Sequence, residues 1–152
     1  MRNSPIFLLF ANTIISATTL CAQVNSYFEK KTGFRRSEVL GKNLKFLQCA
    51  DTEASAVAEM SEALRFARPW RGCLTNQTSS GDTQFKNLLA IKPIFGGDGS
   101  YIYVICLSLD VTRDVDGSSR KTKLLGELID LIPDRLVRDD AEQPPGCLEF
   151  LG

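Results

Sequence analysis

The side chains with the most reactive chemistry in this 152-residue chain are its five cysteines, and the chain has no histidine to activate them. An odd number of widely spaced cysteines argues against a disulfide framework and against zinc, and fits a reducing compartment. No phosphate-binding glycine loop is present either, so we expect a protein that is not an enzyme. No two of the cysteines form a Cys-x-x-Cys pair; they are Cys21, Cys49, Cys73, Cys106 and Cys147.

The charge of the chain is balanced. Lys and Arg together number 18, as do Asp and Glu, so the formal net charge is zero. A nucleic-acid-binding domain normally shows a basic excess, so we expect no nucleic-acid partner. A hydrophobic fraction of 43% is enough for one core at this length. We therefore expect a single domain with a short extension.

Five stretches have the composition of β-strands. Two short apolar runs occupy residues 6–11 and 20–24. Residues 70–79 and 83–95 alternate around the turn-rich "SSGD" and predict a hairpin, and residues 101–112 are rich in β-branched and aromatic residues. The sequence therefore predicts an antiparallel five-stranded sheet.

The helical signals fall between the second and third strands. Short helices are predicted near residues 26–32, 37–40 and 43–47, followed by a longer one over residues 51–67 with apolar side chains at a 3.6-residue period. Strands, then short helices, then antiparallel strands indicate an α+β domain with helices on one face of the sheet.

The C-terminal part of the chain differs in composition. Residues 113–123 are polar and predict a linker, residues 124–138 hold an amphipathic helix region, and residues 139–152 resemble a flexible tail. An isolated helix of this length is marginal in water and must pack against something. The apolar stripe from Leu124 to Ile132 can cover the domain's own sheet, or it can contact a second copy or another protein. Both interpretations remain open.

The N-terminal residues 1–22 admit two interpretations. An early arginine, an apolar run and small residues near Ala22 are typical of a signal peptide, which would make the protein secreted. Several Asn, Ser and Thr residues interrupt the run, which is too short to span a membrane. We prefer two buried strands, and hence a cytoplasmic protein without a membrane partner.

The motifs and their order resemble a PAS domain, and specifically the light-oxygen-voltage (LOV) family of flavin photosensors. "NSYFEKKTGFRRSEVLGKNLKFLQ" (25–48) is similar to that family's Asn-x-x-Phe, Thr-Gly-Tyr and Glu-Val-Leu-Gly-x-Asn-Cys-Arg-Phe-Leu-Gln elements. "LTNQTSSGDTQFKNLLAIKPI" (74–94) is similar to its Asn-Tyr-x-x-x-Gly-x-x-Phe-x-Asn hairpin, and "YIYVICLSLDVT" (101–112) to its closing strand. The resemblance covers residues 5–112 and implies a PAS fold that holds FMN or riboflavin without a covalent bond.

The resemblance also implies roles for individual polar residues. Asn76 and Asn87 match the amides that bind the polar edge of the flavin ring, for which a group that both donates and accepts is suited. Asn43 and Gln48 match ligands of the ribityl chain. Lys45 replaces an arginine that pairs with the phosphate, which keeps the charge and loses the bidentate geometry.

Several positions depart from the family pattern. Leu44 replaces the cysteine that forms a reversible adduct with the flavin under blue light, so no adduct can form there. Ser108 replaces a glutamine that responds to the flavin, and is too short for the same contact. Ser61 replaces a second phosphate-binding arginine, which favours riboflavin, loosely held FMN or an empty pocket. Cys106 replaces a glycine; it either fills space or contacts the ring as a redox group. Leu89 completes the expected cofactor contacts.

Two functions follow as hypotheses. The first is a sensory module that binds flavin and signals by photoreduction in place of the cysteinyl adduct. The second is a cofactor-free module for protein interaction. In either case the stripe from Leu124 to Ile132 would mediate homodimerisation or partner binding.

Overall fold

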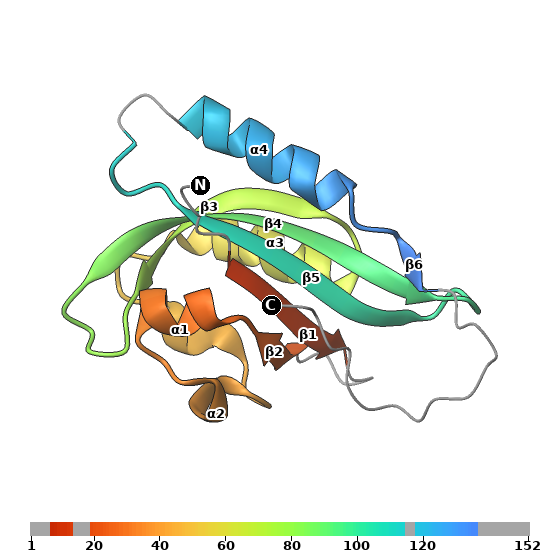
Figure 1. Cartoon of the computed structure of the whole chain (residues 1–152), viewed down its shortest axis with the longest axis horizontal. Coiled ribbons are helices and arrows are strands. Elements are labelled where there is room, and N and C mark those ends of the chain that lie inside the picture. The colour runs from red at the N-terminus through yellow and green to blue at the C-terminus, as the bar shows by residue number, and fades with distance from the viewer. Residues whose placement is uncertain (1–6, 14–18, 115–117, 137–152) are drawn as a thin grey trace.

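An antiparallel sheet runs through the centre of the protein, with helices on both faces (Figure 1). The computed structural model describes residues 7–13, 19–114 and 118–136, with the side chains of 7–13, 118 and 119 left out. The strand order is β2-β1-β5-β4-β3. In chain order the elements are β1 (Phe7–Thr13), β2 (Thr19–Val24), α1 (Ser26–Thr32), α2 (Arg36–Val39), η1 (Leu44–Leu47, a 3₁₀ helix), α3 (Ala54–Arg65), β3 (Trp70–Gln77), β4 (Gln84–Gly96), β5 (Tyr101–Asp110), α4 (Ser118–Asp130) and β6 (Arg135–Leu136).

The central strands β4 and β5 are buried on both faces. Phe85, Leu89 and Cys106 point into a core that also contains residues of α1, α2 and η1, while Ala90 and Leu107 belong to a second core beneath α4. Because successive side chains of a strand point to opposite faces, a strand covered on both sides reads as almost continuously apolar. This accounts for the composition of "YIYVICLSLDVT".

The five antiparallel strands confirm the predicted α+β PAS fold, and the structure adds a sixth strand. β6 pairs in parallel with the end of β4, through Phe95↔Arg135 and Gly96↔Leu136. A strand of two residues is too short to show alternation, so nothing in the sequence indicated it.

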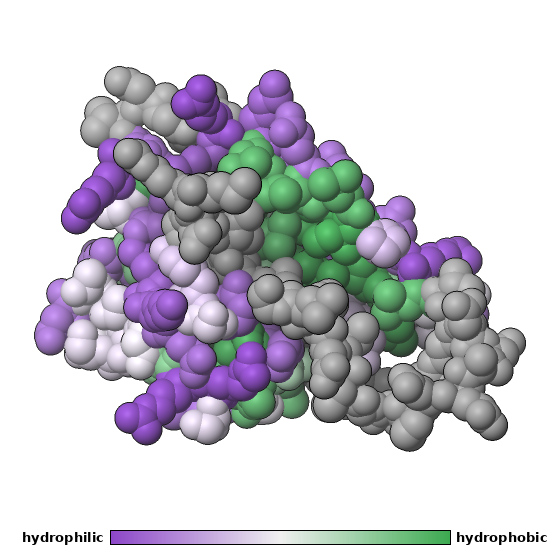
Figure 2. Space-filling view, viewed as in Figure 1, coloured by the Kyte–Doolittle hydropathy of each residue, from purple (hydrophilic) through white to green (hydrophobic). Residues whose placement is uncertain are grey.

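Helix α4 covers the outer face of the sheet, where Leu125 and Ile129 are buried against β4 and β5. Figure 2 shows apolar side chains gathered along the edge of α4 and the adjoining sheet, with a hydrophilic outer side. The apolar stripe of α4 therefore packs against the domain's own sheet, which was the first of its two interpretations. Leu131, beyond the last residue of the helix, is 79% exposed.

The ends of α4 differ from the predicted boundaries. The helix begins at Ser118, inside the stretch 113–123 that composition predicts as a linker, because a polar stretch without an apolar period can still form a helix. It ends at Asp130, since Pro133 disfavours a helical conformation in the residue before it. The predicted tail, 139–152, lies outside the described residues.

The first two predicted strands are confirmed as β1 and β2. The signal-peptide alternative falls partly on residues 1–6 and 14–18, which lie outside the described part of the chain. Within residues 7–13, 19–114 and 118–136, no helix has the length and apolar character needed to cross a bilayer.

The longer helix is shorter than predicted. Its range of 51–67 becomes Ala54–Arg65, with Glu53 as the N-terminal flanking residue. Thr52 does not cap the helix. Its hydroxyl donates to the carbonyl of Thr75 at 2.5 Å and accepts from the backbone N–H of Cys49 at 2.9 Å, which ties the loop before α3 to β3.

Candidate functional site

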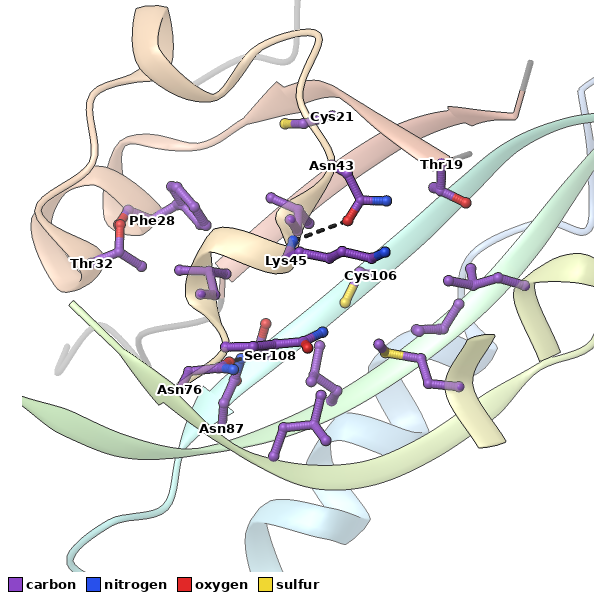
Figure 3. Close-up of a pocket in the computed structure, with 18 of the residues that line it drawn as sticks. Thr19, Cys21, Phe28, Thr32, Asn43, Lys45, Asn76, Asn87, Cys106 and Ser108 are labelled. Carbon is purple, nitrogen blue, oxygen red and sulfur yellow. Dashed lines mark hydrogen bonds between the residues drawn. The ribbon is translucent and has the colours of Figure 1, made fainter. Parts of the chain in front are cut away.

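A cavity lies between the inner face of the sheet and the helices α1, η1 and α3 (Figure 3). The cavity has a volume of about 120 Å³, counted as the space that the centre of a water molecule can occupy. This is on the order of ten times what one water molecule needs. The lining is mostly apolar with a few polar groups, as is typical of a small-molecule site. All nine predicted site residues line it: Asn43, Leu44, Lys45, Gln48, Asn76, Asn87, Leu89, Cys106 and Ser108.

Two buried asparagines form the polar floor of the cavity. Asn76 on β3 and Asn87 on β4 point to the same face of the sheet, and Nδ2 of Asn87 donates to Oδ1 of Asn76 at 2.8 Å. Asn87 is 5% exposed, yet its Oδ1 has no hydrogen-bond partner in the described protein. Nearly all buried polar groups are paired, and an unpaired one requires an explanation.

The η1 turn forms the opposite wall. Oδ1 of Asn43 accepts the backbone N–H of Lys45 at 3.0 Å and so caps the turn, which leaves its Nδ2 as a donor (Figure 3). Leu44 is half-buried against the core, whereas Lys45 is exposed. The backbone of Gln48 is bridged to Asn76 and thereby fixes the turn against β3.

Strand β5 contributes Cys106 and Ser108, both buried and both on the cavity face. Burial raises the pKa of the Cys106 thiol to about 12, and a hydrogen bond with Ser108 opposes this only in part. The thiol is therefore protonated at neutral pH, and the thiolate that acts as a nucleophile is essentially absent. Leu89 on β4 lies opposite Ser108 in the sheet register.

Some lining residues were missed by sequence reasoning. Cys21 is buried at the cavity, next to the η1 turn: its N–H donates to Lys42 at 2.9 Å and its carbonyl accepts from Gly41 at 2.7 Å. Nothing in the sequence pairs Cys21 with this turn. Met60 and Leu64 of α3 also line the cavity, and their four-residue spacing on the apolar stripe was a usable signal.

Two other described cysteines lie outside the lining of the cavity. Cys49 is half-buried beside Thr52, whose hydroxyl approaches its sulfur at 3.7 Å. Cys73 on β3 is exposed. Neither side chain is placed to react with a molecule held between Asn76 and Leu44.

A charged cluster supports the floor from outside the cavity. The carboxylate of Glu53 accepts the backbone N–H of Thr75 at 2.7 Å, its hydroxyl at 2.8 Å and the ammonium of Lys86 at 2.7 Å. These bonds, led by that from Lys86, lower the pKa of Glu53 to about 2. The cluster joins the start of α3 to β3 and β4 at Thr75 and Lys86, which pair in register between the positions of the two asparagines.

The fold is that of a PAS domain with an internal cavity, and a comparison with known families agrees. A family model described as "PAS domain" matches residues 7–113, so the chain belongs to the PAS domain family. Its relatives place it in the light-oxygen-voltage branch of that family.

Several of the similar curated proteins are named as blue-light photoreceptors or blue-light-activated kinases. The chain is 35% identical over 116 residues to phototropin-2 from rice, which covers 76% of this chain and 12% of the relative. It is 35% identical over 105 residues to a blue-light photoreceptor from Listeria monocytogenes, covering 69% of this chain and 41% of the relative. The chain thus spans less than half the length of these relatives.

Solved structures show the same likeness. The LOV domain of a blue-light-activated histidine kinase from Erythrobacter litoralis has a TM-score of 0.66 and 28% identity, covering 72% of this chain and 98% of that domain. For the kinase itself the TM-score is 0.74 with 26% identity, covering 83% of this chain and 40% of the kinase. The matched region is a sensory module that in some relatives is linked to a kinase.

Proposed function

We propose that this chain is a sensory module that holds a flavin, FMN or riboflavin, without a covalent bond and without a cysteinyl adduct. The observation that carries the proposal is the unpaired Oδ1 of Asn87, buried at the floor of a cavity whose lining is mostly apolar. Such an atom costs free energy unless a ligand with a donor group pairs with it.

The hydrogen-bonding groups of Asn76 and Asn87 fit the polar edge of a flavin, where carbonyl oxygens flank an N–H group. Oδ1 of Asn87 can accept from that N–H, and the amide N–H groups of Asn76 and Asn87 can donate to the carbonyls. Leu89 and Leu44 offer apolar surface to the two faces of a flat ring. Bound there, the flavin would absorb blue light and accept an electron.

The reactive cysteine of related photosensors has no counterpart at this site. Leu44 carries no nucleophile, and burial raises the pKa of the two thiols that line the cavity, Cys21 and Cys106, which makes both poor ones. We therefore infer that the signal arises from a change in hydrogen bonding along β5. The hydroxyl of Ser108 can donate or accept, so it can follow a change of protonation in a neighbouring ligand.

Strand β5 also leads from the cavity to α4. Asp110 lies two residues beyond Ser108 on the same face. Its backbone carbonyl accepts a hydrogen bond from the ammonium of Lys121 on α4 at 2.9 Å. Its carboxylate pairs with Lys31 of α1. A displacement of β5 would thus reach both helices, and we propose α4 as the output element.

We also propose that the C-terminal end of this region contacts a second copy or a partner. Leu131 is a large apolar side chain left exposed at the end of α4. Light scattering over a range of concentrations tests this: the native chain should gain mass on concentration, and Leu131→Asp should not. Identical masses for both chains would remove the proposal.

The free cysteines suit a reducing compartment, and we propose a cytoplasmic protein. The central test is an absorption spectrum of the chain purified with riboflavin and FMN supplied. We expect a flavin spectrum whose pigment is released on denaturation, and a bleach in blue light that requires an electron donor. A colourless protein that takes up neither flavin would favour the cofactor-free interaction module.

A further inference from the structure

We infer that the cavity selects a flavin without a phosphate group, so that riboflavin binds at least as tightly as FMN. The inference deepens the proposed function and depends on it. It starts from the charge of the lining: of the twenty residues that line the cavity in the described chain, only Lys45 is charged.

Lys45 is a weak partner for a phosphate. A phosphate monoester carries a charge of about −1.5 to −2 at neutral pH, and a single lysine cannot neutralise it. The side chain is exposed, and no bond that we observe holds its ammonium in place; only its backbone N–H is fixed, by Asn43. An exposed pair of this kind contributes little to affinity, because water screens it and ordering a lysine costs entropy.

Helix α3, on the other side of the cavity, adds no cation that lines it. Its lining residues are Met60 and Leu64, both apolar. Between them Ser61 and Glu62 are exposed. The exposed residues of this turn therefore offer a hydroxyl and a negative charge, which would repel a dianion.

The basic residue that ends α3 is engaged elsewhere. Arg65 lies over the ring of Phe66, with 5.4 Å between the guanidinium carbon and the ring centroid. Such a contact favours the cation at that position, away from the lining to which Met60 and Leu64 belong. Arg65 therefore does not complete a phosphate site with Lys45.

The remaining polar residues near η1 that line the cavity are neutral. The Nδ2 group of Asn43 and the side-chain amide of Gln48 lie at the cavity, and Thr19 adds a hydroxyl. Amides and hydroxyls can each donate and accept, which suits the hydroxyl groups of a ribityl chain. The lining therefore matches a sugar-alcohol tail better than a phosphorylated one.

The test compares the dissociation constants of the full chain for riboflavin and for FMN, by quenching of flavin fluorescence. We expect a constant for FMN equal to or above that for riboflavin, with little dependence on salt, since no strong ion pair contributes. If neither flavin binds, the inference and the proposed function are both overturned. If both bind and FMN binds more tightly than riboflavin, the inference alone is overturned.

A substitution sharpens this test. Ser61→Arg places a second cation beside the cavity, with two parallel donors for a phosphate, and should shift the ratio of the two constants towards FMN by about tenfold. Ser61→Gln is the matched control, similar in length and uncharged, and should leave the ratio unchanged. An equal shift in both variants would show that charge at this position does not decide the choice, and would overturn the inference.

Discussion

The amide of Asn87 donates one hydrogen bond to Oδ1 of Asn76 at 2.8 Å, while its own Oδ1 remains buried and unpaired. The first bond fixes the orientation of both amides, and strands β3 and β4 hold them on a rigid sheet. Both asparagines line the cavity, and the unpaired oxygen is an acceptor without a donor among the described residues. In our proposal, a ligand with an N–H group supplies that donor.

Replacing both asparagines with leucine should separate stability from binding. Asn76→Leu/Asn87→Leu removes the unpaired oxygen and also both groups of the hydrogen bond between the two amides. The free energy of unfolding of the flavin-free protein should therefore stay level or rise by about 1 kcal/mol. Flavin affinity should fall at least tenfold. Urea unfolding and fluorescence titration measure the two effects.

The single variant Asn87→Leu is the control for this pair. It leaves Oδ1 of Asn76 without its donor, so it should lower the free energy of unfolding by about 1–3 kcal/mol. A double variant that loses stability as the single one does, and still binds flavin, would contradict the role assigned to the amides.

Leu44→Cys should introduce the cysteinyl-adduct photochemistry that we propose the native chain lacks. Leu44 lines the cavity, so a thiol there would meet the bound flavin. Blue light should then bleach the visible flavin band of the variant, with recovery in the dark and without an added electron donor. Leu44→Ser is the matched control. Equal behaviour of the cysteine and serine variants would place the ring elsewhere.

The cysteines should differ in reactivity. Because the pKa of Cys106 is raised to about 12 by burial, only about one part in ten thousand is thiolate at pH 8. Iodoacetamide should therefore modify the exposed Cys73 and spare Cys106 in the native protein. Mass spectrometry of the two peptides gives the extents, and both should react in denaturant. Equal rates of modification of Cys73 and Cys106 in the native protein would mean that β5 opens readily.

Acid should weaken the cluster around Glu53. Its pKa is about 2 in the folded protein, below its ordinary value of 4.5, chiefly because Lys86 donates to it. A carboxylate with a lowered pKa stabilises the fold above pH 4.5 and loses that contribution as the pH falls towards 2. At pH 7 the free energy of unfolding of the native chain should exceed that of Glu53→Gln by about 1 kcal/mol. The difference is small because the carboxylate is partly exposed. The difference in unfolding free energy should vanish near pH 2; a constant difference would exclude the charge as its source.

Lys92 should hold α4 on the sheet. Its side chain, 16% exposed, donates to the carbonyls of Ile129 and Ile132 at the end of α4 and pairs with Asp134 at 3.0 Å. Lys92→Met should lower the free energy of unfolding by about 1–2 kcal/mol and speed amide hydrogen exchange in α4.

Lys123→Met is the control for Lys92. Lys123 is 78% exposed and lies 3.8 Å from Glu127 on the same helix, a pair that contributes little. Exchange in α4 should be unchanged in this variant. If Lys92→Met leaves exchange in α4 unchanged as well, the bonds from Lys92 do not hold the helix on the sheet.

The sequence by itself determined the order of the elements, and its resemblance to the light-oxygen-voltage family indicated which residues meet at the cavity. Alternation in β5 placed Cys106 and Ser108 on one face, and the motif around Asn43 predicted a helical turn. Such patterns are local, because the period of a strand or helix decides which side chains share a face. That these residues bind a flavin stays a prediction.

The tertiary structure decided what depends on contacts between distant segments. The choice of the sheet as the partner of α4, the pairing of β6 with β4, and the position of Cys21 beside η1 have no signal in spacing. The unpaired oxygen of Asn87 is of the same kind, since the sequence supplies the amide but only the packed structure removes its water. Burial and pairing are properties of the assembled core, and they turn two ordinary asparagines into a candidate binding site.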